Sequence, residues 1–254
     1  MTDFNRILLA VAPQGKAEVR EGFAAALPSC IGRADLTTPM RLAHFLAQCA
    51  HESAGFATTT ELASGVDYEG RRDLGNVRKG DGKRFKGRGL LQITGRANYE
   101  KFGAAIGVEL MDNPAMAAAF PTAALTAAEF WRDRGLNRFA DSDDVRGVTR
   151  GVNGGLNGLA SRMIYLARAK RALADLKGAL LDAAATETAM KHAKLATAAT
   201  ATPLAFAAPL QMQLPPWGAA LLMAIGVAAV LAILVAANRH KQAAADLTAA
   251  AHGV

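Results

Sequence analysis

Two glutamates nine residues apart, Glu52 and Glu61, have a type and spacing that point to chemistry. Glu52 follows an apolar stretch of helical period and lies roughly 20° from Phe45 on that helix face, at about 100° per residue. A carboxyl group beside an apolar face, at the negative end of a helix dipole, tends to keep its proton. A general acid needs that property near neutral pH. The alternative is an ordinary helix-end glutamate that faces solvent.

Glu61 can approach Glu52 only if the helix ends between them, because on a continuous helix the two would point about 180° apart. Gly55 is a suitable residue to end the helix, and residues 56–60 could then carry Glu61 back toward Glu52. Two carboxyl groups that flank a space, one protonated and one ionised, form the pair used in glycoside hydrolysis. The alternative for Glu61 is a surface-loop glutamate.

Residues 90–94 alternate apolar and polar side chains, which predicts a short strand. Leu91 and Ile93 would pack on one face, and Gln92 and Thr94 would lie together on the other. The amide could bind a sugar, and the hydroxyl could hold a water molecule for attack. The alternative is a half-exposed strand with no such role.

The helix that positions Glu52 has a clear beginning and a clear apolar stripe. Thr38 is a good N-cap, and Pro39 suits the first helical position. The stripe consists of Leu42, Phe45, Leu46 and Cys49.

Other helices are expected around it. They cover residues 3–12, 16–27, 97–107, 115–119 and 121–135, a stretch capped by residues 141–144 and running to Thr149, and residues 159–180. Pro28 is expected to end the second of these helices. In the last, Met163, Ile164 and Leu166 are expected to pack inward.

Three separated segments, in the right order, resemble glycoside hydrolase family 19, and most nearly its bacteriophage endolysin branch. They are residues 43–53, residues 80–99, and residues 153–159 followed by Arg162. The resemblance covers roughly residues 1–175. It implies a mainly α, lysozyme-like helical domain with a short strand element at the cleft.

The resemblance also implies roles for individual residues. Glu52 would be the general acid, Glu61 the second carboxylate, and Thr94 the group that positions the attacking water in an inverting reaction. The sugar cleft would be lined by Gln92, Asn98, Asn153 and Arg162. The short interval between Glu52 and Glu61 is similar to that of endolysins, whereas plant-type chitinases of the family carry an insertion there. This favours peptidoglycan over chitin.

The composition suits an anionic partner, because the net charge is +7 and the sequence pI is about 9.7. Cell wall and nucleic acid both fit that charge. We expect no nucleic-acid partner, because no nucleic-acid motif occurs and only three tyrosines and two tryptophans could stack on bases. Much of the excess lies in a basic loop made of Arg78, Lys79, Lys83, Arg84, Lys86 and Arg88, and a solvated surface is the alternative there.

No metal or cofactor is expected. The only cysteines, Cys30 and Cys49, have no metal-ligand spacing, and they are more typical of small buried hydrophobes than of a disulfide. His51-Glu52 lacks the second histidine of a zinc protease helix. The glycines of residues 80–89 match neither a phosphate loop nor a dinucleotide fingerprint.

The chain beyond the helical domain changes character. Residues 1–180 form the predicted catalytic domain, and residues 181–216 an Ala/Thr/Pro-rich linker with too few large apolar side chains for a core. Residues 217–237 contain no charge and are long enough for a transmembrane helix, followed by a short polar tail over 238–254. A buried Ala-rich helix is the alternative for 217–237.

This tail predicts a single-pass C-terminal anchor in the inner membrane of a bacterial host. Arg239 and Lys241 follow the span and favour a cytoplasmic C-terminus, with the enzyme facing the periplasmic cell wall. The opposite orientation would require a separate pore-forming lysis partner. The expected function is that of a phage or prophage endolysin that hydrolyses the glycan strand of peptidoglycan. The alternatives are a chitinase and an inactive, membrane-tethered wall-binding protein.

Overall fold

The computed structural model describes residues 3–176. The predicted linker (181–216), transmembrane helix (217–237) and polar tail (238–254) lie outside the described residues. Among residues 3–176, no helix has both the length and the apolar character needed to cross a membrane.

Helices dominate the described part of the chain, as predicted. In order they are α1 (Asp3–Val11), α2 (Ala17–Arg33), α3 (Pro39–Glu52), η1 (Val66–Tyr68), η2 (Arg72–Leu74), α4 (Asp81–Arg84), α5 (Arg96–Ile106), η3 (Pro114–Ala118), α6 (Thr122–Asp133), α7 (Asn137–Asp141) and α8 (Val145–Asn153). A further helix covers residues 159–176. Within the described residues, extended pairing is limited to the isolated bridges Thr60–Arg88 and Arg88–Ile93.

α3 forms where its capping residues and apolar period predict it. The Thr38 side chain accepts a hydrogen bond from the backbone N–H of Arg41, and Pro39 occupies the first turn. The whole predicted stripe is buried, and the Phe45 ring packs edge-on against Trp131, with 5.4 Å between the ring centroids. α3 is therefore a central, fully packed element that presents its last residue, Glu52, at the edge of the core.

α2 does not end at Pro28, contrary to the expectation, but continues to Arg33. A proline inside a helix removes one backbone hydrogen bond and costs about 3 kcal/mol. Here Pro28 lies on the exposed side, so its ring displaces no packed side chain. Beyond it, Cys30 is completely buried, and Arg33 donates to the Ala105 carbonyl and to Glu129. These tertiary contacts offset the local penalty.

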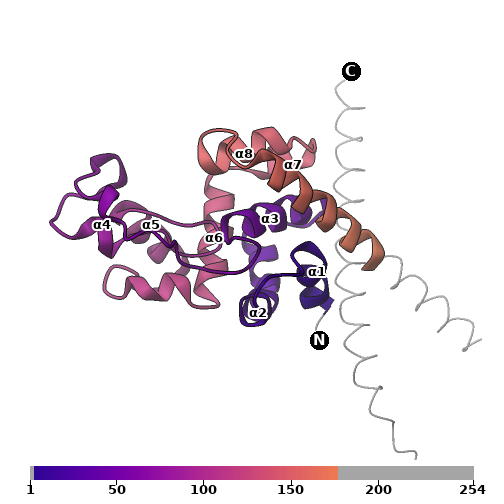
Figure 1. Ribbon diagram of the computed structural model, residues 1–254, viewed down its shortest axis with the longest axis horizontal. Coiled ribbons are helices and arrows are strands. Elements are labelled where there is room, and N and C mark those ends of the chain that lie inside the picture. The colour runs from indigo at the N-terminus through magenta and orange to yellow at the C-terminus, as the bar shows by residue number, and fades with distance from the viewer. Residues whose placement is uncertain (1–2, 177–254) are drawn as a thin grey trace, which may run out of the picture. The chain divides into compact units, whose positions relative to one another are not determined.

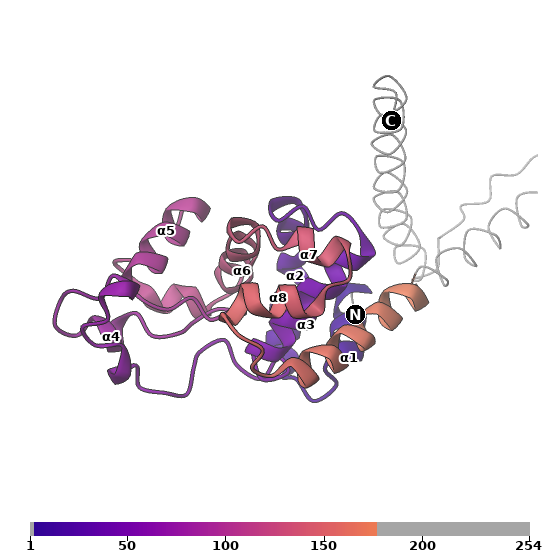
Figure 2. The same cartoon turned by 90° about the horizontal axis from the view of Figure 1, so that it is seen from above.

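α6 joins the two ends of the described part. It packs against α2 on one side and α5 on the other. Figure 1 shows α4 and α5 at one end and α1 and α2 toward the opposite end, with α6 between them, and the turned view in Figure 2 agrees. The interior of α6 is apolar, with Phe130 and Trp131 buried and Leu125 partly buried against the core.

The predicted strand over residues 90–94 is wrong. The segment is a tight turn in which Gln92 has a φ of +52°, and only Ile93 pairs, with Arg88. Leu90, Leu91 and Ile93 are all buried. Because a turn can bury an apolar residue on each side of its polar tip, it leaves the same alternating pattern as a strand.

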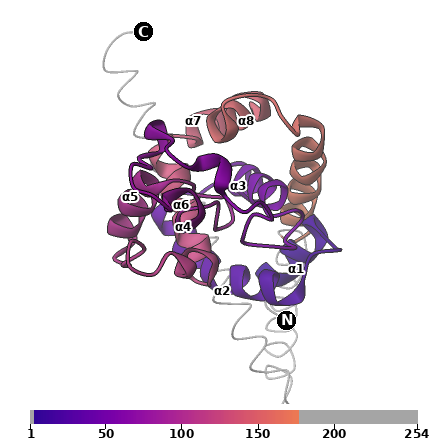
Figure 3. The same cartoon turned by 60° about the vertical axis from the view of Figure 1, so that its left-hand side comes forward.

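The helix over residues 159–176 buries a different face from the predicted one. Met163 and Ile164 are 52% and 54% exposed, whereas Leu166 is buried as expected. Arg162 is 1% exposed and lies one turn before Leu166 on the inward face. Figure 3 shows this helix, in orange, running beside α3 and α1.

A carboxylate at a strained turn fastens this helix to α3. Asp143, with a φ of +56°, accepts hydrogen bonds from Lys170 at 2.7 Å and lies 2.8 Å from Nε2 of His44. Burial lowers the pKa of His44, and Asp143 opposes that shift. The contact fixes the rotation of the last helix relative to α3, and with it the place of Arg162.

Cys30 and Cys49 are both free and buried, as expected of small hydrophobes. Burial raises the pKa of the Cys30 thiol to about 12 and that of Cys49 well above its ordinary value.

Candidate active site

Glu52 is the last residue of α3, and the chain reverses immediately after it. Ser53 caps the helix, and three consecutive residues, Ala54, Gly55 and Phe56, have φ between +53° and +72°. Left-handed backbone is costly for Phe56, but its ring is completely buried and lies 5.7 Å from that of Phe23. The predicted helix end before Gly55 is therefore confirmed.

The Glu52 carboxylate is paired with a buried guanidinium. Arg162 Nη2 donates to Glu52 Oε1, and the side chains are 1% and 20% exposed, respectively. Arg162 also donates to the Gln48 side chain, one turn before Glu52, and to the Asn157 carbonyl at 3.3 Å. The sequence argument placed Glu52 beside apolar groups and a helix dipole but did not include this cationic partner.

Asn153 supports the same network from the loop that precedes Arg162. Its amide donates to the Asn157 carbonyl at 3.0 Å, and its side-chain oxygen accepts from the Gly155 N–H at 2.8 Å. Asn153 and Arg162 thus share one carbonyl acceptor. In this structure Asn153 is exposed and closes the glycine-rich loop, in addition to any contact with a sugar.

His51 lies between this loop and Glu52. Its Nδ1 is 2.9 Å from the Ser161 hydroxyl, and a Cβ placed on Gly158 would come within 2.3 Å of the imidazole ring. Gly158 also has a φ of +71°, so only glycine fits there. Burial and the charge of Arg162 lower the pKa of His51, against the opposing effect of Glu52, so the ring is neutral near pH 7.

Glu61 is held by a different set of donors. Its Oε1 accepts from the Gly87 N–H at 2.9 Å and its Oε2 from the Tyr68 hydroxyl at 3.0 Å. The backbone of Glu61 also donates to the Gly87 carbonyl at 3.0 Å, beside the Thr60–Arg88 bridge. The carboxylate therefore accepts two hydrogen bonds from neutral groups and has no cation on it within the described residues.

Gln92 lies next to Glu61 across Gly87. A Cβ on Gly87 would be 2.7 Å from Gln92 Oε1 and 3.0 Å from Glu61 Oε2, so the absence of a side chain lets these two groups meet. Gln92 Oε1 is buried and has no hydrogen-bond partner among residues 3–176. A buried acceptor without a partner is costly, and a ligand N–H or O–H at this point would satisfy it.

Thr94 and Asn98 follow Gln92 closely. The Thr94 hydroxyl donates to the Gln92 carbonyl at 3.1 Å, and the Asn98 amide donates to the Thr94 carbonyl at 2.7 Å. The hydroxyl still has acceptor lone pairs, so it can accept a hydrogen bond from a water molecule. Its orientation comes from the turn over residues 90–94 and not from a strand face.

The predicted site residues thus fall into two groups. One contains Glu52, Arg162 and Asn153, and the other contains Glu61, Gln92, Thr94 and Asn98. No hydrogen bond between the two groups occurs in the part of the chain described here. The sequence interpretation gave no role to Gln48, His51 or Tyr68, because their contacts depend on segments distant in the chain.

The basic loop divides into bracing and exposed residues. Arg84, Lys86 and Arg88 donate to backbone carbonyls, Lys86 to those of Glu61 and Ala63 at 3.1 Å each. Arg78, Lys79 and Lys83 are exposed. Part of the positive charge therefore holds the Glu61 loop in place, and the rest is free to attract an anionic surface.

Comparison with known proteins agrees with this architecture. The profile of the family described as chitinase class I, glycoside hydrolase family 19, matches residues 21–147. A glycosyl hydrolase family 19 domain-containing protein of Haemophilus influenzae is 31% identical over 56% of this chain and 84% of its own length. Acidic endochitinase Q of Nicotiana tabacum is 35% identical over 44% of this chain, which spans 43% of that protein.

Solved structures share the fold. Chitinase C of Streptomyces griseus superposes with a TM-score of 0.55 at 21% identity, over 66% of this chain and 90% of that one. A class IV chitinase of Zea mays gives 0.52 at 23% identity, over 67% and 90%. The extent of the profile match and the coverage of the Haemophilus relative lead to one conclusion: the chain belongs to glycoside hydrolase family 19 and is a glycoside hydrolase.

Proposed function

We propose that this glycosidase is a phage or prophage endolysin that cleaves the glycan strand of peptidoglycan. The observation that carries the mechanism is the difference between the two carboxylates. Glu52 is paired with the buried cation Arg162, whereas Glu61 accepts hydrogen bonds from Tyr68 and a backbone N–H. Different surroundings allow two carboxyl groups to take different roles.

In the proposed reaction Glu52 donates its proton to the leaving glycosidic oxygen. Arg162 then stabilises the carboxylate that Glu52 becomes. A water molecule held by the Thr94 hydroxyl gives its proton to Glu61, and its oxygen attacks the anomeric carbon from the opposite face, with inversion. Gln92 Oε1, buried and without a partner within residues 3–176, accepts a hydrogen bond from the sugar.

The short interval between Glu52 and Glu61 supports peptidoglycan as the substrate. Only eight residues separate the carboxylates in the sequence, and three of them make the reversal after α3. Chitin is the second candidate, because the plant relatives are named endochitinases. An inactive wall-binding protein is the third, and the presence of both carboxylates and Thr94 argues against it.

Turnover on purified peptidoglycan and on chitin oligomers separates these candidates. An endolysin should release soluble fragments from peptidoglycan, and mass analysis of the new reducing ends identifies the bond that is cut. Cleavage of chitin oligomers without cleavage of peptidoglycan would assign the second candidate. No cleavage of either by folded protein would assign the third.

We further propose that residues 217–237 anchor the enzyme in the bacterial inner membrane, with the catalytic domain toward the periplasmic wall. The absence of charge over 217–237 and the positions of Arg239 and Lys241 support this orientation. Protease added to intact spheroplasts should digest the catalytic domain. Full protection until the membrane is permeabilised would reverse the orientation and require a pore-forming lysis partner.

A further inference from the structure

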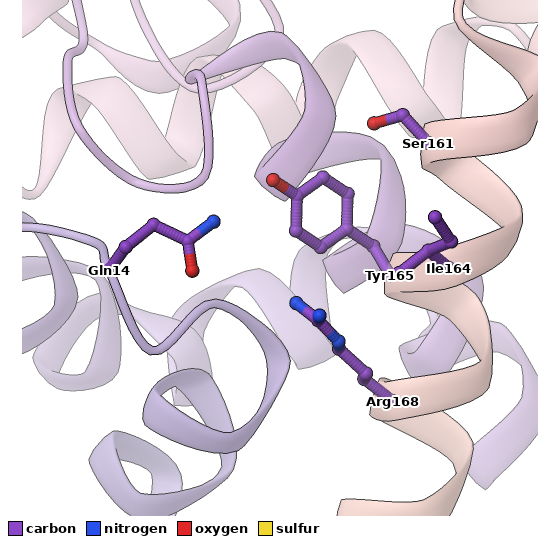
Figure 4. A pocket seen from close by; sticks show the side chains of 5 residues that line it. All are labelled: Gln14, Ser161, Ile164, Tyr165 and Arg168. Carbon is purple, nitrogen blue, oxygen red and sulfur yellow. The ribbon is translucent and has the colours of Figure 1, made fainter.

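A second polar pocket lies beside the site, between the helix over residues 159–176 and the loop after α1. Its volume is about 200 Å³, and its lining consists of Gln14, Ser161, Ile164, Tyr165 and Arg168. Figure 4 shows the last four projecting from successive turns of one helix, with Gln14 facing Tyr165 and Arg168 across the space. Their spacing along the helix places them on one face.

The lining is rich in hydrogen-bond donors, and no acidic residue contributes to it. Arg168 makes one hydrogen bond within the described residues, from Nη1 to the Val11 carbonyl at 3.3 Å, which leaves further guanidinium N–H groups for a ligand. A Cβ on Gly55 would lie 3.0 Å from the Tyr165 hydroxyl and 3.3 Å from Gln14 Nε2, so these donors converge at one point. Guanidinium, phenol and amide donors together suit a carboxylate.

The pocket adjoins the Glu52 group through two pairs of neighbouring residues. Ser161, in its wall, contacts His51, and the next residues along both helices, Arg162 and Glu52, form the buried ion pair. A ligand in the pocket would therefore lie about one residue away from the proposed acid on each of two helices. This is close enough for the pocket to hold a substituent of the same substrate.

We propose that this pocket binds a carboxylate of the stem peptide carried by the muramic acid of peptidoglycan. The inference rests on the proposed function, since chitin has no acidic substituent and peptidoglycan carries one on each stem. The site would select for stem-bearing glycan next to the cleaved bond. The exposed apolar side chain of Ile164 would contact the methyl groups of the stem's alanine residues.

The test is a calorimetric titration of the full-length protein with N-acetylmuramyl-L-alanyl-D-isoglutamine, which has one free carboxylate, and with its methyl ester. Wild type should bind the acid roughly five- to tenfold more tightly than the ester, as expected for the loss of one charge-assisted hydrogen bond. In Arg168→Gln this preference should fall to about one. Inorganic phosphate, titrated as a competitor, distinguishes a stem carboxylate from a general anion site.

Arg171→Gln is the matched control, because it removes the same charge from the same helix but does not line the pocket. It should keep the preference for the acid. Equal affinities for acid and ester in wild type, an unchanged preference in Arg168→Gln, or phosphate binding as tight as that of the muramyl peptide would each overturn the proposal.

Arg168 also contacts the last carbonyl of α1, so its replacement could lower stability. A purely structural role would weaken the acid and the ester equally and leave their ratio unchanged, which the titration detects. The ligand is tested without catalysis, so a protein that cleaves only chitin oligomers but still binds the acid through Arg168 would contradict the proposed function and not the pocket.

Discussion

Arg162 is buried against Glu52 although 110 positions separate the two residues in the sequence. The exposure of the pair is unequal, since Glu52 is 20% exposed and Arg162 only 1%. A substrate can therefore reach the carboxylate but not the guanidinium. Arg162 acts as a positioning residue that joins the glycine-rich loop, the last helix and the end of α3 around the proposed acid.

Replacing Glu52 with Gln should abolish cleavage without unfolding the protein. The amide cannot donate a proton with the required acidity, but its oxygen can still accept from Arg162. Turnover on the cleaved polysaccharide and circular dichroism measure the two effects. Glu109→Gln, an exposed glutamate far from these contacts, should retain wild-type turnover. Wild-type rates in folded Glu52→Gln protein would exclude Glu52 as the acid.

Replacing Arg162 with Ala should lower the free energy of unfolding by about 2–4 kcal/mol, because Gln48 and the Asn157 carbonyl lose a buried donor. Denaturant unfolding of the full-length chain measures this loss. Arg168→Ala, which removes one longer hydrogen bond to Val11 from an exposed residue, should lose less. A smaller effect at position 162 than at 168 would contradict the central place of this ion pair.

Replacing Glu61 with Gln should lower turnover by roughly 10²- to 10⁴-fold, the usual contribution of a general base. Tyr68→Phe removes one neutral hydrogen bond from Glu61 but leaves the Gly87 N–H in place. Its effect should therefore be about fivefold, equivalent to roughly 1 kcal/mol. A Tyr68→Phe enzyme as inactive as Glu61→Gln would mean that Tyr68, and not Glu61, carries the step.

Local chemistry was enough to predict α3 from the sequence. The Thr38 cap, Pro39 and a stripe of apolar residues all act within a few positions, and each is found where expected. The same reasoning failed at Pro28, because burial of Cys30 two residues later outweighs the local cost of proline. Short-range propensity decides a helix only where no tertiary contact opposes it.

The inward face of the last helix could not be read from hydrophobicity. Met163 and Ile164 are more apolar than Arg162, yet the arginine is the buried one. Its burial depends on the Glu52 carboxylate and the Gln48 amide, which are contributed by a distant helix. A charged residue lies in the interior only with such partners, and a single sequence does not show which partner meets it.

Thr94→Val should lower turnover while changing stability by about 1 kcal/mol or less. Valine keeps the shape of threonine but cannot hold a water molecule, and the lost hydroxyl donates only one hydrogen bond, to the Gln92 carbonyl. Thr94→Ser should recover much of the rate, because it restores the hydroxyl. If melting temperature collapses while activity per folded molecule holds, Thr94 serves the turn and not the reaction.

The stability of the α4–α5 region should depend on pH through Asp81. This carboxylate is 2% exposed and accepts from Arg96 Nε at 2.9 Å and from the backbone N–H groups of Val77 and Arg78. The Arg96 side chain, aided by these N–H groups, lowers the pKa of Asp81 to about 2.

Because the folded pKa lies below the unfolded value of about 3.9, the ionised form stabilises the fold. The contribution, roughly 2 kcal/mol, is complete above pH 4–5 and is lost as the pH falls toward 2. Urea unfolding of wild type and Asp81→Asn should show a clear difference at pH 7 that shrinks as the pH approaches 2. A difference that stays constant between these pH values would show that packing, and not the charge of Asp81, stabilises this region.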